Sequence, residues 1–313
     1  MNRIKPKKLN KGDLIGIINP ASPVSDFNRI NKSVEYFEKL GYKVKLGKNI
    51  EKQKGYLAGS EEERLYDLHS MFEDNEVKAI FCARGGYGSG KIISGINYKI
   101  IRQNPKIFVG YSDITALHLA FYSQTGLVTF AGPMPAVDFY DSVSPFTEEH
   151  FWNIITTDKP IGKIDNPKSE DFIFLSQGRS EGKLAGGNLS VIVSLIGSKF
   201  FPDLNDSVLL LEDLNEPPYK IDRMLNQLKL AGVFNQVKGI LLGNFKDCIE
   251  DDPNKPTLSL HEVFGSYFRE LKKPVIYNLK HGHIKDNLTI PFGLTVKIYS
   301  AKGLIEIKES AVN

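Results

Sequence analysis

The sequence predicts an α/β protein with a doubly wound, mostly parallel, flavodoxin-like N-terminal domain and a smaller mixed α/β C-terminal domain. Two observations lead to this prediction. Short apolar runs of strand length alternate with segments of helical periodicity through the first half of the chain. These runs lack the polar alternation of a half-exposed strand, which suits a parallel sheet covered by helices on both faces.

The N-terminal elements follow one another in a regular order. We expect strands at residues 14–18, 42–46, 79–83, 107–109 and 128–131. We expect helices over residues 26–40, over 60–72, in a short piece after Gly90 and from Asp113 onward. Ser60 and Glu63 form a capping box, and Gly41 ends the first helix. The N-terminal domain should therefore cover residues 1–158.

A stretch richer in Pro, Asp, Lys and Gly follows, and we expect residues 159–180 to link the two domains. The C-terminal domain, residues 181–313, opens on a glycine-containing segment. Its expected strands cover residues 207–211, 237–242, 275–277, 294–299 and 304–307, and its expected helices lie around 221–228 and at 261–271.

Composition narrows the class of protein. The chain has 313 residues, of which 41% are hydrophobic and 25% charged, as in a soluble globular protein. No apolar run is long enough to span a membrane, and we expect no secretory signal. The net charge of +3 gives no reason to expect a nucleic-acid partner. The two cysteines fit a reducing cytoplasm, and no Cys/His cluster has zinc-ligand spacing.

Ser112 lies where an expected strand turns into an expected helix. Gly110 allows a sharp turn, and Asp113 suits the first turn of a helix. A serine at such a turn exposes its hydroxyl beside amides at the positive end of a helix dipole, as in a nucleophile elbow. The motif Gly-Tyr-Ser-Asp lacks the second glycine of that elbow, and serine is also a common helix N-cap. Both interpretations stay open.

Three loops follow expected strands, where open α/β sheets place their sites. The first, residues 84–88, is glycine-rich and can point amides at an anion, although it matches no phosphate-loop motif and could be a flexible turn. The second presents Glu212 directly after a strand, followed by Asp213 and Glu216, which could cap a helix. The third carries His281 and His283.

A serine needs a base to become a nucleophile, and a carboxylate fixes the tautomer of a histidine base. Ser112, Glu212 and one of the two loop histidines supply these three groups, each after a strand. The combination favours a hydrolase, with a two-domain binding protein as the non-catalytic alternative.

The sequence resembles the LD-carboxypeptidase family of serine peptidases, which also contains the microcin C immunity peptidases. The resemblance covers nearly the whole chain. Its motifs, in order, are Lys11-Gly12-Asp13, Asn19-Pro20-Ala21-Ser22, Ala83-Arg84-Gly85-Gly86-Tyr87-Gly88, Gly110-Tyr111-Ser112-Asp113, Leu184-Ala185-Gly186-Gly187-Asn188, Leu211-Glu212-Asp213 and Gly282-His283.

The resemblance implies a catalytic triad in which Ser112 is the nucleophile, His283 the base and Glu212 the orienting acid. It selects His283 over His281 because the family histidine follows a glycine at this point. We expect the oxyanion to be held by the backbone N–H groups of Gly86 and Asp113.

An exopeptidase must also bind the terminal carboxylate of its substrate, which requires charged or N–H donors. Arg84 and Arg223 are the candidates that the sequence offers for this role.

The implied activity is that of a cytoplasmic, homodimeric serine carboxypeptidase. It would hydrolyse an L-to-D peptide bond and release the terminal D-alanine of murein tetrapeptides in cell-wall recycling. The partner is a small peptide, and we expect no metal, organic cofactor, nucleic acid or membrane to take part. One alternative is an immunity-type peptidase that cleaves acyl-adenylate or acyl-sulfamoyl antibiotics such as microcin C. The other is a non-catalytic small-molecule binding protein.

Overall fold

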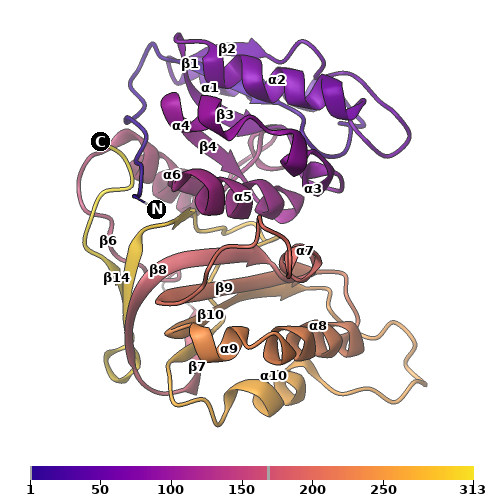
Figure 1. Ribbon diagram of the computed structural model, residues 1–313, viewed down its shortest axis with the longest axis vertical. Helices are drawn as coiled ribbons and strands as arrows, with labels where there is room; N and C mark the ends of the chain where they lie inside the picture. The colour runs from indigo at the N-terminus through magenta and orange to yellow at the C-terminus, as the bar shows by residue number, and fades with distance from the viewer. Residues whose placement is uncertain (1, 168–169) are drawn as a thin grey trace.

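The protein is built on two β-sheets, which lie one above the other in Figure 1. The structure is a computed structural model and describes residues 2–167 and 170–313. Residue 1 of the expected N-terminal domain and residues 168–169 of the expected linker lie outside this description.

The first sheet has the strand order β12-β5-β4-β3-β1-β2. Its strands are β1 (Leu14–Ile18), β2 (Lys43–Leu46), β3 (Val77–Cys82), β4 (Ile107–Gly110), β5 (Thr129–Ala131) and β12 (Ile290–Phe292). The first five are parallel, in the flavodoxin-like order 2-1-3-4-5, which confirms the predicted fold class. The sixth, β12, comes from the C-terminal half and pairs antiparallel with β5.

Helices cover both faces of this sheet. In β4, Ile107 and Val109 belong to the apolar core that includes helices α1 and α6, whereas Phe108 belongs to the core that includes α2, α4 and α5. Successive strand residues point to opposite faces, so both faces of β4 are buried. The elements are α1 (Asn28–Lys39), α2 (Glu61–Glu73), α3 (Ser89–Ile92), η1 (Ile93–Gly95), α4 (Tyr98–Gln103), η2 (Ser112–Ile114), α5 (Thr115–Thr125), a π-helical turn η3 (Pro135–Phe139) and α6 (Pro145–Thr156).

The second sheet has eight strands in the order β6-β14-β13-β8-β9-β10-β11-β7. Its parallel centre is formed by β8 to β11, and antiparallel strands complete both edges. The strands are β6 (Gly162–Lys163), β7 (Ile173–Ser176), β8 (Arg179–Asn188), β9 (Ser207–Leu214), β10 (Gly239–Lys246), β11 (Val275–Tyr277), β13 (Thr295–Tyr299) and β14 (Leu304–Ile307). The helices are α7 (Leu189–Leu195), α8 (Pro218–Leu230), α9 (Val233–Gln236), α10 (Leu260–Phe268) and η4 (Ser300–Lys302).

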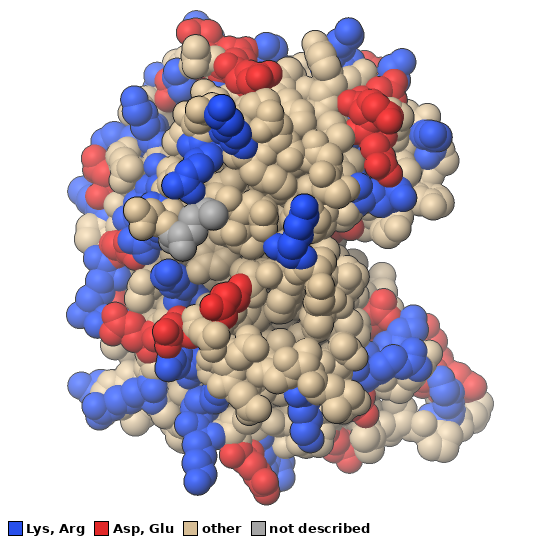
Figure 2. All heavy atoms as spheres, viewed as in Figure 1, with Lys and Arg blue, Asp and Glu red and all other residues tan. Residues whose placement is uncertain are grey.

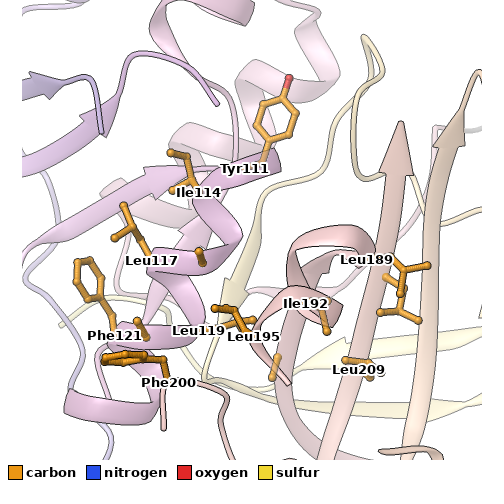
Figure 3. Close-up of a cluster of buried hydrophobic side chains, with 14 of the residues drawn as sticks. Tyr111, Ile114, Leu117, Leu119, Phe121, Leu189, Ile192, Leu195, Phe200 and Leu209 are labelled. Carbon is orange, nitrogen blue, oxygen red and sulfur yellow. The ribbon is translucent and has the colours of Figure 1, made fainter. Parts of the chain in front are cut away.

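Helices α5 and α7 join the two halves of the molecule. Their apolar side chains face one another in a buried cluster that includes Leu119 of α5 and Leu195 of α7 (Figure 3). At the start of α5, the Thr115 hydroxyl accepts a hydrogen bond from the Asn188 amide at 3.0 Å. The nucleophile candidate before α5 and the C-terminal sheet are therefore held in a fixed relation.

The structure differs from the expected elements where strands carry glycine or lie in the expected linker. Strand β8 did not stand out in the sequence because its interior is rich in glycine. A Cβ on Gly186 would lie 2.0 Å from the Leu210 carbonyl oxygen, so the close approach of β9 requires glycine there. Strands β6 and β7 lie within residues 159–180, so part of this stretch belongs to the second sheet.

Charges of both signs are mixed on the visible face of the molecule. Figure 2 shows Lys and Arg interspersed with Asp and Glu on the face in view. Within residues 2–167 and 170–313, no helix has the length and apolar character needed to cross a bilayer.

Candidate active site

Ser112 occupies a strained turn between β4 and α5. Its φ is 63°, a left-handed conformation that costs a non-glycine residue on the order of 1–2 kcal/mol. The side chain caps neither η2 nor α5, so the helix-cap interpretation is wrong. Gly85 lies directly against this turn, where an added Cβ would come within 2.9 Å of the Ser112 Cβ. The geometry resembles a nucleophile elbow, in which the strained backbone presents the hydroxyl.

Gly86, one of the two residues expected to hold the oxyanion, lines the same cavity as Ser112, and Asp113 follows Ser112 directly. The Asp113 carboxylate points away from the turn and accepts a hydrogen bond from the Ser89 amide at 2.8 Å, while burial raises its pKa. In the part of the chain that the structure describes, no hydrogen bond uses the N–H of Gly86. Gly86 has a φ of 109°, which only glycine adopts readily.

Glu212 and His283 are joined by a hydrogen bond. The Nδ1 of His283 lies 2.8 Å from Oε2 of Glu212, whose side chain is 1% exposed. Glu212 belongs to β9, which runs on to Leu214 beyond the expected strand end. Burial lowers the pKa of His283, but the hydrogen bond and charge of Glu212 oppose this, and the pKa is raised overall. The structure therefore brings Glu212 and His283 into contact, as a histidine base and its orienting carboxylate would require.

The neighbouring alternatives have structural partners. His281 is buried, its Nδ1 lies 2.7 Å from the Leu288 carbonyl oxygen, and burial lowers its pKa. Asp213 accepts hydrogen bonds from the Ser190 amide at 2.9 Å and from Asn188 Nδ2 at 3.1 Å. It therefore ties down the start of α7, the helix before β9, and burial raises its pKa to about 6.

Ser112 and His283 line one cavity of about 320 Å³ at the boundary of the two sheets. Between these two side chains the structure gives no hydrogen bond, which is common in free enzymes, where catalytic contacts tighten on binding. Arg84 lines the same cavity, and its Nη1 donates to the Pro23 carbonyl oxygen at 3.2 Å. Arg223 is exposed on α8 over the Tyr219 ring and is not among the residues that line the cavity.

Two further groups lie beside His283 and were not predicted from the sequence. The Tyr111 ring packs edge-on against the His283 ring, with centroids 5.1 Å apart. Asp138, in η3, accepts a hydrogen bond from the Met134 amide at 2.8 Å, while burial raises its pKa to about 6. Tyr111 directly precedes Ser112 and could have been noticed, whereas no motif marks Asp138.

Comparisons with known proteins identify the family of this chain. The LD-carboxypeptidase N-terminal domain matches residues 15–132, and the LD-carboxypeptidase C-terminal domain matches residues 181–298. The chain is 44% identical over 300 residues to a protein of Bacillus subtilis (strain 168) named "Probable murein peptide carboxypeptidase", covering 95% of this chain and 92% of that one.

Two solved structures share the whole fold. The structure of MccF in complex with glutamyl sulfamoyl guanosine superposes with a TM-score of 0.90 at 28% identity, covering 99% of each chain. The muramoyltetrapeptide carboxypeptidase from Oxalobacter formigenes superposes with a TM-score of 0.81 at 27% identity, covering 94% of this chain and 97% of that one. The chain thus belongs to the LD-carboxypeptidase family and is a carboxypeptidase, a hydrolase acting on peptide bonds.

Proposed function

We propose that this protein is a serine carboxypeptidase that uses Ser112, His283 and Glu212 as its catalytic triad. The observation that carries the proposal is the hydrogen bond between His283 and buried Glu212, in a cavity that also contains the strained Ser112 turn. Because Nδ1 of His283 is engaged by Glu212, Nε2 is the nitrogen available to Ser112.

The reaction follows from this arrangement. His283 takes the proton of the Ser112 hydroxyl as the oxygen attacks the substrate carbonyl, and Glu212 stabilises the imidazolium that forms. The developing oxyanion accepts hydrogen bonds from the amides of Gly86 and Asp113, and loss of one such donor typically costs about 3–4 kcal/mol. His283 then gives its proton to the leaving amine, and water repeats the sequence on the acyl-enzyme.

The proposed substrate is a murein tetrapeptide, hydrolysed at its L-to-D bond to release the terminal D-alanine during cell-wall recycling. The names of the Bacillus and Oxalobacter relatives support this class. The likeness to MccF supports a second candidate, hydrolysis of acyl-sulfamoyl nucleosides. The intact set of Ser112, His283 and Glu212 favours either activity over a non-catalytic binding protein.

We further propose that the protein is a homodimer in the cytoplasm. Light scattering on the purified protein would test the oligomeric state.

A substrate panel decides between the candidates. The protein is incubated with L-Ala-D-Glu-diaminopimelate-D-Ala, with its all-L isomer and with glutamyl sulfamoyl adenosine, and the released products are separated by chromatography. Release of D-alanine from the first compound alone supports the murein activity. Cleavage of the nucleoside alone would replace it with the immunity-type activity.

Replacement of the nucleophile tests the serine mechanism. Ser112→Ala should lower turnover by about a million-fold, the usual loss when a triad nucleophile is removed. The variant should keep its melting temperature or gain slightly, since the hydroxyl has no partner in the described part of the chain. Activity within tenfold of the wild type would exclude Ser112 as the nucleophile.

A further inference from the structure

A second, larger cavity opens on the other side of His283. Its volume is about 480 Å³, and it is bounded by the segment from Val137 to Thr147, the end of β10 and the loop after His283. It shares Tyr111, Val137, Leu214 and His283 with the cavity that contains Ser112, so the two are continuous. Neither Ser112 nor the glycine-rich loop lines it.

The chemistry of acyl transfer indicates which part of the substrate enters this cavity. In the attack by Ser112, the carbonyl oxygen turns toward the amides of Gly86 and Asp113, while the leaving nitrogen must face His283 to receive its proton. The leaving nitrogen therefore lies where the two cavities meet. The released part of the substrate continues beyond His283 into the larger cavity, while the acyl part stays beside Arg84.

Two lysines on separate elements line the larger cavity. Lys246 is the last residue of β10 and pairs in register with Leu214, two residues beyond Glu212. Lys285 follows His283 by two residues, in a loop held in place because the Thr147 hydroxyl donates to the Lys285 carbonyl oxygen at 2.9 Å. Both side chains are exposed, and neither forms an ion pair with any residue in 2–167 or 170–313.

The acidic residues that line the cavity do not pair with these lysines, so both lysines are free to bind an anion. Asp138 accepts a hydrogen bond from the Met134 amide at 2.8 Å. Asp141 is exposed and pairs with neither lysine. Ser144 and Thr147 bring the first turn of α6 to the same wall, and the positive end of a helix dipole adds to the attraction for an anion.

We propose that Lys246 and Lys285 bind the terminal carboxylate of the residue that is released, and that the larger cavity is the leaving-group subsite. The inference rests on the proposed carboxypeptidase function and replaces Arg84 and Arg223 as the groups that recognise the free C-terminus. A carboxylate bound by two ammonium groups explains how an open cavity selects the end of a peptide without a steric wall. The cavity also has room for released residues much larger than alanine.

The test compares the tetrapeptide acid with its C-terminal amide. The wild type should cleave the acid with a kcat/KM roughly 10- to 100-fold above that of the amide, the range expected for charge-assisted hydrogen bonds. In the double variant Lys246→Gln/Lys285→Gln, kcat/KM for the acid should fall to about the value for the amide, which itself stays unchanged. The loss should appear mainly in KM, because the lysines do not touch the reacting atoms.

Two further variants make the result decisive. Lys229→Gln/Lys302→Gln removes two equally exposed lysines that line neither cavity, and it should keep the wild-type preference for the acid. Arg84→Gln should also keep the preference. A preference lost in Arg84→Gln but kept in the Lys246/Lys285 variant would overturn the assignment and leave the carboxypeptidase activity standing. Failure of the wild type to cleave either peptide would overturn the proposed function, and this assignment with it.

Discussion

At the scale of single residues, His283 makes the proposed chemistry measurable as a function of pH. The base must be neutral to accept the Ser112 proton, so kcat/KM should fall as pH drops through the pKa of His283. Glu212 raises that pKa, so the midpoint should lie above the ordinary histidine value of about 6.5. Asp213 and Asp138 contribute to the pKa in the same direction with smaller effects.

Glu212→Gln removes the carboxylate that contributes most to raising the pKa of His283. Without the carboxylate charge, burial dominates, and the acid limb of kcat/KM should move to lower pH, with activity down by about 10³- to 10⁴-fold. Asp138→Asn should move the limb less, in the same direction. A pH profile with the same midpoint in both variants and the wild type would show that a different group titrates.

Gly85 provides a second test at this scale, because it lies against Ser112, the proposed nucleophile. A Cβ at Gly85 would be 2.9 Å from the Ser112 Cβ and 3.3 Å from the Asp113 amide nitrogen. Gly85→Ala should therefore shift the Ser112 turn, lower kcat by about a hundredfold and destabilise the fold by about 1–3 kcal/mol.

Gly90→Ala is the matched control for that change. Gly90 lies five residues further on, in α3, and the nearest atom to its added Cβ is 3.8 Å away. This variant should keep wild-type kinetics and stability. Equal activity of the two alanine variants in a steady-state assay would mean that the Ser112 turn tolerates displacement.

At the scale of elements, β9 carries two adjacent carboxylates, Glu212 and Asp213, that have different roles. Glu212 faces His283, whereas Asp213 holds the amide of Ser190 and the side chain of Asn188 at the start of α7. Asp213→Ala should leave those buried donors unpaired and lower the free energy of unfolding by about 2–4 kcal/mol. Asp213→Asn, which keeps an acceptor oxygen, should lose less than half of that. Denaturant titration measures both, and an unchanged midpoint for Asp213→Ala would refute the structural role.

Much of this element pattern could be predicted from the sequence, and the failures have physical causes. Strands β1, β3, β4 and β5 of the first sheet were visible because short apolar runs suit strands buried on both faces, and β2 because its residues alternate. Strand β8 was hidden because its glycines serve close backbone contacts, and β12 because its partner β5 lies far away in sequence. Ser112, Glu212 and His283 follow local motifs. Asp138 and Lys246 reach the cavities beside His283 only through the tertiary fold, so no motif or spacing in the sequence indicates them.

At the scale of the whole molecule, three buried histidines lie near the place where β12 joins the C-terminal half to the first sheet. The His118 Nε2 lies 2.7 Å from the Gly110 carbonyl oxygen, and its ring packs edge-on against Phe292 of β12. The His150 Nδ1 accepts a hydrogen bond from the Thr289 amide at 3.2 Å, just before β12. His281 lies close enough to both that its charge would repel theirs.

These histidines should make the assembly of the two sheets sensitive to acid. Burial lowers the pKa of His118 and of His150 to about 4, and it also lowers the pKa of His281. A histidine whose pKa is lower in the folded state contributes its full stability above the unfolded value of about 6.5 and loses it as pH falls toward 4. Each of the first two should therefore lower the free energy of unfolding by roughly 3 kcal/mol between pH 7 and pH 4.

The measurement is the free energy of unfolding by denaturant at intervals from pH 7.5 to pH 4.5, on the wild type and on His150→Gln. Glutamine can still accept the Thr289 amide but cannot become charged, so the stability of the variant should decline less steeply with acid. His261→Gln, at an exposed position on α10, is the control and should follow the wild-type curve. If His150→Gln declines as steeply as the wild type, the acid sensitivity arises elsewhere, for example from the titration of surface carboxylates. A flatter curve confined to His150→Gln would show that a neutral histidine beside β12 stabilises the fold in which the proposed nucleophile Ser112 and the proposed base His283 come together.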